Sequence, residues 1–433
     1  MQIILLSGGS GKRLWPLSNE IRSKQFIKIF ETSNGYESML QRVLQQIHKV
    51  SDEIKITIST SKTQEKILRK YINPDVDISV EPCRRNTFPA IVLTAAYLHE
   101  VKNVDVEESL VICPVDPYVE DSYFSAFKNM ANLVDSANLI LMGIAPTYPS
   151  EKYGYIIPAS KENISAVLEF KEKPNIQAAQ NYIERGGLWN GGVFACKLSY
   201  ILKKAREILG TDYYSELLKN YSKLPNTSID YAVVEHEKDI KVLRYVGDWK
   251  DVGTWNTLTE VMAEQNIGKV YFDKTCENSH VINETDVPII AMGLKNIVVA
   301  ASPDGILVAD KVQSSYIKPL AENIHEEIRF AEKSWGTYQV IDVGENSLTI
   351  KVILNAGNKM NYHSHNFRDE VWTVVEGSGR AIIDNELKNV TVGDVIKIPR
   401  GVKHTIIAET VLKVIEVQIG EDITVEDKIL WEA

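Results

Sequence analysis

A glycine-rich loop near the N-terminus has the composition of a phosphate-binding site. It reads SGGSGKRLWPL over residues 7–17 and follows an apolar run at residues 3–6. Glycines permit positive φ angles and a close approach of backbone amides to a phosphate, and basic side chains add charge beside them. The candidate phosphate contacts are Gly8, Gly9, Gly11, Lys12 and Arg13. The GxxxxGK[ST] and GxGxxG spacings are both absent, so the glycines alone would equally suit a tight structural turn.

A second group of residues, near the C-terminus, has the spacing of a metal site. Residues 363–370 read HSHNFRDE, and GDVIKIPRGVKH follows at residues 393–404. Side chains two residues apart on a strand share a face, so the first two histidines point the same way. The candidate ligands are His363, His365, Glu370 and His404. This nitrogen and oxygen set suits Zn²⁺, Mn²⁺, Fe²⁺ or Co²⁺. The spacing resembles the cupin signature, which implies a small double-sheet barrel.

The elements that must position the first group alternate between strand and helix. Short apolar or β-branched runs predict strands at 3–6, 54–60, 110–115 and 139–144. Amphipathic stretches predict helices at 36–50, 88–99 and 123–136. Such alternation implies βαβ crossovers, so we expect an α/β domain with a Rossmann-like, mostly parallel sheet that helices cover on both faces.

The hydrophobic pattern changes beyond about residue 330. Apolar residues alternate with polar ones over 348–354, and turns follow at short intervals, which predicts an all-β domain. Between the two patterns lie β-branched runs at 287–300 and a predicted helix near 313–331. We therefore expect a first domain over residues 1–262, a β-rich connector packed on it over 263–332, and a cupin domain over 333–433.

Composition and charge narrow the class of protein. The chain has 433 residues, of which 44% are hydrophobic and 24% charged, as in a soluble globular enzyme. Its net charge of −10 disfavours a nucleic acid or an anionic membrane as partner. The four cysteines lack both CxxC spacing and the density of a disulfide scaffold, which favours a reducing cytoplasm. The sequence shows neither a signal peptide nor an apolar span of transmembrane length.

Eight sequence blocks resemble the sugar-1-phosphate nucleotidylyltransferases and, within them, the mannose-1-phosphate guanylyltransferases. They occur in that family's order over about 250 residues. The blocks are GGSGKRLWPLSNEIRSKQF (8–26), EPCRRNTFPAI (81–91), PVDPYV (114–119), YGYI (153–156), FKEKP (170–174), LWNGGVF (188–194), SIDYAVVE (228–235) and GDWKDVGTW (247–255). The resemblance implies transfer of GMP from GTP to mannose 1-phosphate, with GDP-mannose and pyrophosphate as products.

The resemblance also assigns roles to residues. The catalytic set is Arg13, Lys24, Asp116 and Asp251, in which the two aspartates resemble the family's Mg²⁺ ligands. Asp116 follows the strand 110–115, at the edge where open α/β sheets bind ligands. The nucleotide-binding set adds Arg85, Asn86 and Thr87 to Gly8, Gly9, Gly11 and Lys12. The sugar-phosphate set is Gly154, Glu172, Lys173, Asn190 and Gly191, with Lys173 on the phosphate and Glu172 on sugar hydroxyls.

The cupin part resembles the isomerase half of bifunctional mannose-6-phosphate isomerase/mannose-1-phosphate guanylyltransferases, through Trp335-Gly336, HSHNFRDEVW and the closing EVQIGEDITVED at 416–427. Two departures bear on activity, because Thr405 and Thr424 stand where those isomerases carry arginines. A hydroxyl is a weaker partner for a phosphate dianion than a guanidinium. We therefore expect an intact metal site and weak isomerase chemistry, with Lys403 and Arg400 as the nearby cations that would compensate.

Two further departures, Arg84 in place of a small residue and Pro117 in place of histidine, lie within the nucleotidyltransferase blocks. Three hypotheses stay open. The first is the guanylyltransferase, with GTP and mannose 1-phosphate as partners. The second keeps the reaction with another base or sugar 1-phosphate, and the third is an inactive binding or regulatory protein. Homo-oligomerisation is compatible with each of them.

Overall fold

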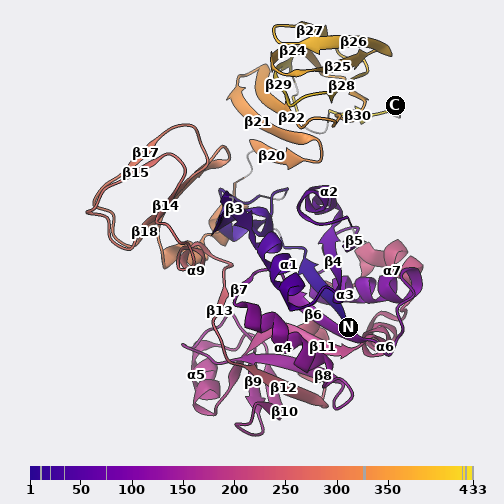
Figure 1. Ribbon diagram of the computed structural model, residues 1–433, viewed down its shortest axis with the longest axis vertical. Coiled ribbons are helices and arrows are strands. Elements are labelled where there is room, and N and C mark those ends of the chain that lie inside the picture. The colour runs from indigo at the N-terminus through magenta and orange to yellow at the C-terminus, as the bar shows by residue number, and fades with distance from the viewer. Residues whose placement is uncertain are drawn as a thin grey trace. The chain divides into compact units, whose positions relative to one another are not determined.

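The structure, a computed structural model, describes residues 1–9, 12–19, 21–33, 35–74, 76–324, 328–421, 423–424 and 427–431. It divides into two compact units (Figure 1). The first comprises Met1–Leu14 and Ser23–Glu264, and the second comprises Trp15–Arg22 and Gln265–Ala433. The boundaries at residues 262 and 332, and packing of the connector on the first domain, stay predictions. No helix in the described ranges is long and apolar enough to cross a membrane.

A mixed β-sheet forms the centre of the first unit. Its strand order is β5 (Asp77–Glu81), β4 (Lys55–Ser61), β1 (Gln2–Ser7), β6 (Ser109–Pro114), β11 (Leu188–Lys197), β8 (Leu139–Ile144), β12 (Ile240–Tyr245), β10 (Ile164–Lys171) and β9 (Tyr155–Pro158). The β5-β4-β1-β6 part is parallel, as is the β8–β12 pair, whereas β11, β10 and β9 pair antiparallel. The expected α/β class is confirmed, but the prediction of a mostly parallel sheet is not, because parallel pairing is confined to β5-β4-β1-β6 and to β8–β12.

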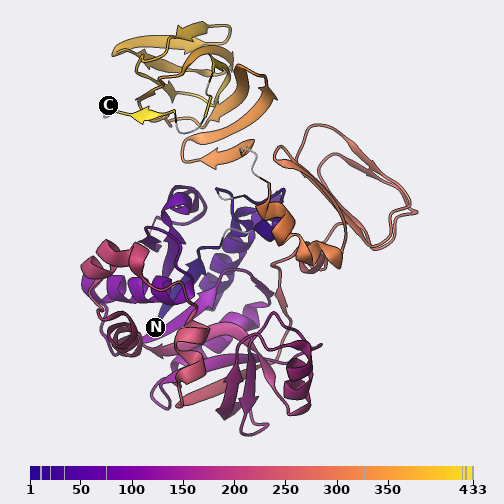
Figure 2. The ribbon, with the colours of Figure 1, turned by 180° about the vertical axis from the view of Figure 1, so that it is seen from behind.

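Helices cover both faces of this sheet (Figures 1 and 2). The helices of this unit are α1 (Met39–Val50), α2 (Lys62–Tyr71), α3 (Thr87–Ala96), α4 (Asp121–Ala131), α5 (Ile176–Glu184), α6 (Leu198–Leu209), α7 (Tyr214–Asn220), α8 (Ile229–Ala232) and α9 (Trp255–Thr259). Helix α1 packs on α4, while α3 packs on α6, α7 and α8. Because β8 is covered on both sides, all six of its residues are buried, which explains its unbroken apolar sequence LILMGI.

Two helix predictions in this unit need corrected boundaries. The helix predicted from residue 36 begins at Met39, because Gly35–Ser38 form β3, which pairs with β2 (Lys28–Thr32). Ser38 then caps α1 by accepting a hydrogen bond from the Gln41 amide, and the Gln41 side chain accepts one from the Ser38 amide. This capping box stops the helix from extending backwards. Helix α4 spans Asp121–Ala131, so it ends five residues before the predicted position 136.

The second unit begins with a small coil of short, mostly parallel strands. One face consists of β14 (Asn266–Ile267), β16 (His280–Asn283), β18 (Ile297–Ser302) and β19 (Gly305–Asp310), and another of β15 (Val270–Phe272) and β17 (Ile289–Ala291). The segment Trp15–Arg22 belongs to this unit. The guanidinium of Arg22 donates to both carboxylate oxygens of Glu284, at 2.6 and 2.9 Å, and Ser302 Oγ donates to the Pro16 carbonyl at 2.7 Å.

The helix predicted near 313–331 is wrong over most of its length. A 3₁₀ turn covers Gln313–Tyr316, the short α10 covers Lys318–Glu322, and β20 already begins at Phe330. Pro319 explains the break, because proline lacks an amide hydrogen and fits only the first turn of a helix. The apolar residues that suggested one amphipathic helix therefore belong to separate short elements.

Two antiparallel sheets form the C-terminal part of the second unit, as expected for a cupin barrel. One has the order β20 (Phe330–Lys333), β21 (Gly336–Val343), β22 (Ser347–Leu354), β29 (Leu412–Gly420), β24 (Arg368–Glu376) and β27 (Val395–Ile398). The other has the order β26 (Glu386–Thr391), β25 (Ser378–Ile383), β28 (His404–Ala408), β23 (His363–Ser364) and β30 (Ile429–Leu430). Their inward residues share one core, which includes Val352, Trp372 and Ile406.

Candidate functional site

An acidic pair lies at the carboxyl end of the parallel strands. Asp116 follows β6, and the adjoining β7 (Pro117–Val119) pairs antiparallel with β13 (Trp249–Asp251). In this register Asp251 is opposite Pro117, so two aspartates 135 positions apart become neighbours. Lys24 Nζ then forms an ion pair with Asp116 Oδ2. The pairing of two three-residue strands therefore assembles the predicted catalytic carboxylates and one of the predicted cations.

The protonation of this cluster follows from its mixed charges. Burial lowers the pKa of Lys24, but Asp116 and Asp251 outweigh it and raise the pKa above its ordinary value. Burial raises the pKa of Asp116, yet Lys24 and Arg13 bring it below the usual range. The pKa of Asp251 is raised, first by burial and also by repulsion from Asp116. All four predicted catalytic residues thus interact electrostatically, and a divalent cation is the charge that two adjacent carboxylates favour.

The glycine-rich loop borders a cavity of about 310 Å³ beside these residues. Its lining includes Gly8, Gly9, Asn86, Thr87 and Asp116, whereas Gly11 lies outside the described residues. Side chains hold the loop backbone from behind. Ser23 Oγ donates to the Gly9 carbonyl at 2.7 Å, and Thr60 Oγ1 donates to the Ser7 carbonyl at 3.1 Å. These bonds hold the backbone at Ser7 and Gly9, the start of the loop, next to the acidic pair.

The predicted nucleotide-binding segment forms the start of α3. Asn86 has a positive φ of 67°, and its side-chain oxygen accepts a hydrogen bond from the Thr87 amide at 2.8 Å. Thr87 Oγ1 in turn accepts one from the Ile229 amide at 3.0 Å. Arg84, which departs from the family pattern, lines the same cavity. Glu81, a buried carboxylate that sequence reasoning missed, lines it as well. The sequence indicated Glu81 only through its position as the first residue of the EPCRRNT block.

The predicted sugar-phosphate residues gather around a second carboxylate cluster. Glu172 is 6% exposed, and its Oε1 accepts a hydrogen bond from Lys173 Nζ at 2.6 Å. Gly154 approaches this carboxylate so closely that a Cβ there would lie 2.5 Å from Glu172 Oε2. The Asn190 amide donates to the Gly154 carbonyl at 2.8 Å. Gly191 is tightly packed, because a Cβ would lie 3.2 Å from the Met142 carbonyl oxygen.

Asp230 is a member of this cluster that sequence reasoning did not single out. Its Oδ1 accepts a hydrogen bond from Asn190 Nδ2 at 2.8 Å, while Asn190 Oδ1 accepts from the Gly192 amide at 3.1 Å. The Asn190 amide plane is thereby fixed. Burial raises the pKa of Asp230. Burial also raises the pKa of Glu172, and the nearby charge of Asp230 raises it further. The only sequence signal was its position inside the SIDYAVVE block.

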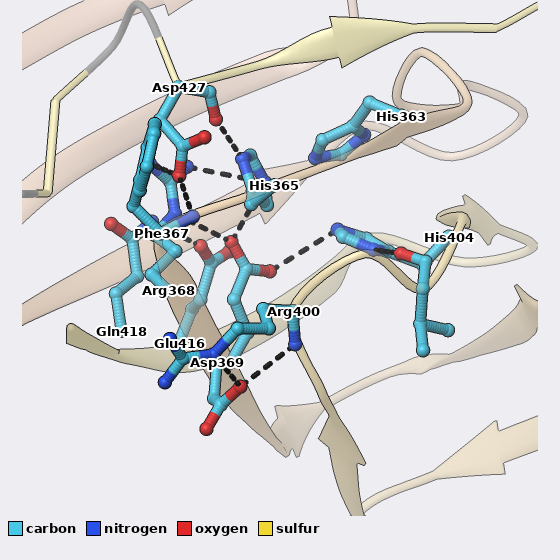
Figure 3. A network of polar contacts seen from close by, with 12 residues as sticks. His363, His365, Phe367, Arg368, Asp369, Arg400, His404, Glu416, Gln418 and Asp427 are labelled. Atoms are coloured by element: carbon cyan, nitrogen blue, oxygen red, sulfur yellow. Dashed lines mark hydrogen bonds and ion pairs between the residues drawn. The ribbon is translucent and has the colours of Figure 1, made fainter.

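Three imidazoles meet inside the cupin barrel (Figure 3). His363, His365 and His404 are buried, and their candidate ligand atoms lie within 4.8 Å of one another. Each Nδ1 bonds to a backbone carbonyl, those of Asn361 at 2.7 Å, Val402 at 2.9 Å and Asp427. A carbonyl only accepts, so each Nδ1 carries a hydrogen, and in the neutral imidazole each Nε2 presents a lone pair. This is the tautomer that metal ligation requires.

Glu370 completes the predicted ligand set. Its Oε1 lies 3.0 Å from His365 Nε2, and its Oε2 lies 3.3 Å from His404 Nε2, which has no hydrogen-bond partner among the described residues. Burial raises the pKa of Glu370, but His365 and His404 bring it well below its ordinary value. Burial also lowers the pKa of His363 to about 2. A carboxylate and neutral imidazoles are the forms that bind a divalent metal, so these residues fit one.

A cavity of about 200 Å³ opens beside His363. Its basic lining residues are Lys333, Arg368 and Lys428. Sequence reasoning proposed Arg400 and Lys403 instead, but neither is among the described residues that line the cavity. Arg400 pairs with Asp369, with 3.6 Å between Nε and Oδ1, and Lys403 Nζ lies 3.7 Å from the centre of the Trp431 ring. The structure thus places neither predicted cation in the lining of this cavity.

The two threonines that replace arginines differ in position. Thr405 is buried and its hydroxyl donates to the Met360 carbonyl at 2.8 Å, so it is occupied within the barrel. Thr424 lines the cavity, and its carbonyl accepts a hydrogen bond from Arg368 Nη1 at 2.9 Å. The Arg368 guanidinium also contacts the predicted metal ligands, since its Nε donates to Glu370 Oε1 at 3.2 Å. Arg368 was not predicted as a site residue.

The fold and these two sites define a nucleotide-processing α/β enzyme joined to a cupin domain. Comparison with known families agrees with this description. The family described as nucleotidyl transferase matches residues 2–266, and the family described as mannose-6-phosphate isomerase C-terminal matches residues 321–432. The chain therefore belongs to the nucleotidyl transferase family, which confirms the resemblance stated from the sequence blocks.

Full-length relatives make the assignment more specific. Mannose-1-phosphate guanylyltransferase RfbM of Salmonella typhimurium is 30% identical over 99% of this chain and 96% of its own. Mannose-1-phosphate guanylyltransferase of Salmonella montevideo is 29% identical over 96% of this chain and 95% of its own. A solved structure described as mannose-1-phosphate geranyltransferase from Thermus thermophilus has a TM-score of 0.65 and 27% identity, and covers 75% of this chain and 99% of that one.

The acidic pair yields a first testable prediction. Asp116→Asn and Asp251→Asn should each lower nucleotidyl transfer by about 100-fold or more, because each removes a negative charge that would hold the metal. Pyrophosphate release measured across a Mg²⁺ titration tests this. Asp248→Asn, an exposed aspartate in the same block, is the matched control and should retain activity. Near wild-type turnover of either site variant at limiting Mg²⁺ would show that the pair does not bind the metal.

The cupin yields a second prediction. The purified protein should retain a divalent metal, and the double variant His363→Ala/His404→Ala should lose it, because two of the three converging lone pairs disappear. Elemental analysis after extensive dialysis is the measurement. His280→Ala removes another buried histidine of the second unit and should leave the metal content unchanged. Equal metal content in the double variant, or none in the wild type, would contradict the assignment.

Proposed function

We propose that the first unit transfers GMP from GTP to mannose 1-phosphate and releases pyrophosphate, with Mg²⁺ as cofactor. The observation that carries this proposal is the cluster of Lys24, Asp116 and Asp251 at the end of the parallel strands, beside the anchored glycine-rich loop. The full-length similarity to proteins named mannose-1-phosphate guanylyltransferase supports the choice of base and sugar.

The reaction needs charge neutralisation and positioning more than covalent chemistry. A phosphate oxygen of mannose 1-phosphate attacks the α-phosphorus of GTP, a new P–O bond forms, and the bond to the β-phosphate oxygen breaks. Arg13 and Lys24 lie where they would offset negative charge on the triphosphate. Asp116 and Asp251 would hold Mg²⁺, which supplies Lewis-acid stabilisation of the phosphate oxygens. Lys24 is already oriented by its ion pair with Asp116.

The second carboxylate cluster suits the sugar. Glu172 presents a carboxylate, which accepts hydrogen bonds from hydroxyl groups, and Lys173 supplies a cation next to it. Asn190 is held in one orientation by Asp230 and the Gly192 amide, so its position is preorganised before substrate binds. An inactive binding protein would not need to retain both clusters, which speaks against the third hypothesis.

Substrate preference tests the proposal directly. With mannose 1-phosphate as acceptor, kcat/KM should be higher for GTP than for ATP, CTP or UTP by about 100-fold or more, because a site that pairs with one base leaves buried polar groups unpaired with another. Pyrophosphate release across the four nucleotides and several sugar 1-phosphates is the assay. Higher kcat/KM with another nucleotide or sugar 1-phosphate would change the proposed substrate but not the proposed reaction. If no pair released pyrophosphate, the proposed nucleotidyl transfer would be rejected.

For the cupin we propose a metal site with weak mannose-6-phosphate isomerase activity. The Thr405 hydroxyl is bonded inside the barrel and Thr424 supplies no charge, so a phosphate lacks the two arginines of the isomerases. Conversion of fructose 6-phosphate to mannose 6-phosphate should therefore be slow or absent in the metal-loaded protein. Thr424→Arg adds a cation at the cavity and should raise the rate. Robust wild-type turnover would mean that Lys333, Arg368 or Lys428 anchors the phosphate instead.

A further inference from the structure

The cavity beside His363 in the cupin barrel has walls that do not suit a phosphorylated sugar. Of the sixteen described residues that line it, nine are aliphatic, aromatic or methionine. Sugar hydroxyls need hydrogen-bond partners when they are buried, and an apolar wall offers none. The composition of the lining therefore points to a ligand that has an apolar body.

Two paired strands build the apolar side of this cavity. Leu348, Ile350 and Val352 alternate along β22 and share its inner face. On β21, Val340 lies opposite Ile350, and Tyr338 lies opposite Val352. All five side chains line the cavity. They form a continuous wall, and each methylene group of a ligand that this wall covers adds favourable apolar burial.

The neighbouring strand β29 continues the same face with polar residues. Glu416 lies opposite Ile350, and Gln418 lies opposite Leu348. Gln418 is 4% exposed and lines the cavity, and its Nε2 donates to Glu416 Oε1 at 2.5 Å. The Oε1 of Gln418 is buried and has no hydrogen-bond partner among the described residues. A buried acceptor without a partner is unfavourable, so the cavity favours a ligand that donates a hydrogen bond at this point.

The charged groups of the lining carry an excess of positive charge. The cations are Lys333, Arg368 and Lys428, and Glu416 is the one carboxylate among the described lining residues. Arg368 donates three of its five N–H groups within the barrel, so two stay available. A guanidinium and a carboxylate form charge-assisted hydrogen bonds, which are stronger than neutral ones. The cavity therefore favours an anionic ligand.

The available guanidinium and the unpaired amide oxygen lie close together. Gln418 is opposite Glu370 in the register of β29 and β24, and Arg368 precedes Glu370 by two residues on the same face of β24. Arg368 and Gln418 are therefore diagonal neighbours, about 7–8 Å apart between Cα atoms, a distance that long side chains bridge. One end of a ligand would contact both groups, while its other end lies against the wall formed by β21 and β22.

We propose that this cavity binds a small 2-hydroxy carboxylate with an apolar chain or ring. The carboxylate pairs with Arg368 and the neighbouring lysines, the hydroxyl donates to Gln418 Oε1, and the apolar part packs on the wall. The cavity volume of about 200 Å³ equals that of about seven water molecules, which suits so small an acid. This inference goes beyond the proposed function, and it explains weak isomerase activity, because sugar hydroxyls would face Leu348, Ile350 and Val352.

Titration calorimetry on the full-length protein tests the class of ligand. The probe is 2-hydroxy-4-methylpentanoate. Lactate should bind about 10-fold or more weakly, because it buries less apolar surface. The acid without the hydroxyl, 4-methylpentanoate, should bind about 10-fold more weakly, because Gln418 Oε1 stays unpaired. Mannose 6-phosphate should also bind more weakly than the probe. Equal affinity for the probe and lactate, or tighter binding of mannose 6-phosphate, would overturn the proposal.

Two variants locate the ligand within the barrel. Ile350→Thr keeps a β-branched side chain but makes the wall polar, so the preference for the probe over lactate should fall about 3-fold or more. Gln418→Met removes the acceptor and should abolish the preference for the probe over 4-methylpentanoate. Ile341→Thr is the matched control, because Ile341 is 50% exposed on β21 and is not among the described lining residues. An unchanged ratio of affinities in either site variant would overturn the proposal.

Measurements before and after dialysis against a chelator separate this proposal from the proposed metal site. The apolar wall belongs to the chain itself, so the ratio of affinities for the probe and lactate should be the same in both states. A protein that holds no metal but keeps this ratio would contradict the metal site alone. A ratio that falls to one after removal of the metal, or a probe that binds in neither state, would overturn the ligand proposed for the cavity.

Discussion

The repulsion between two neighbouring carboxylates is the interaction on which the candidate transferase site depends. Asp116 and Asp251 are adjacent because β7 and β13 pair, and Asp116 makes ionisation of Asp251 less favourable. Lys24 relieves part of that cost through its ion pair with Asp116. A cluster of this kind attracts a divalent cation and anionic phosphates together, because the cation neutralises both. The anchored loop and α3 then define where the rest of a nucleotide can lie.

The cupin site depends on a different constraint, which is the direction of three imidazole lone pairs. Backbone carbonyls of Asn361, Val402 and Asp427 each accept a hydrogen bond from an Nδ1–H, so the tautomers are set by the chain around the histidines. Asp427 contributes further, because its carboxylate accepts from the Asn366 and Phe367 amides and holds the loop after His365. These outer groups thus hold the three imidazoles in the orientation that a divalent metal would need.

The sequence block at residues 8–26 contributes residues to both units. Lys12 and Arg13 belong to the first unit with the glycine-rich loop, whereas Trp15–Arg22 belongs to the second. Within the second unit, Arg22 donates to the carboxylate of Glu284, and Asn19 donates to the carboxylate of Asp304. The length of this block, which exceeds what a phosphate loop requires, follows from that second set of contacts.

The amino-acid sequence by itself determined the class of both domains, since strand and helix periods, the glycine-rich loop and the histidine spacing are local patterns. It also identified Asp116, Asp251 and the histidines, because their residue types and flanking blocks are distinctive. Only the tertiary structure decided where Glu81, Asp230 and Arg368 lie, since each is held by a contact that no local pattern indicates, with Tyr221, Asn190 and Glu370 respectively. A single charged residue has no local signature, and whether it lies on the surface or lines a site depends on how strands pair.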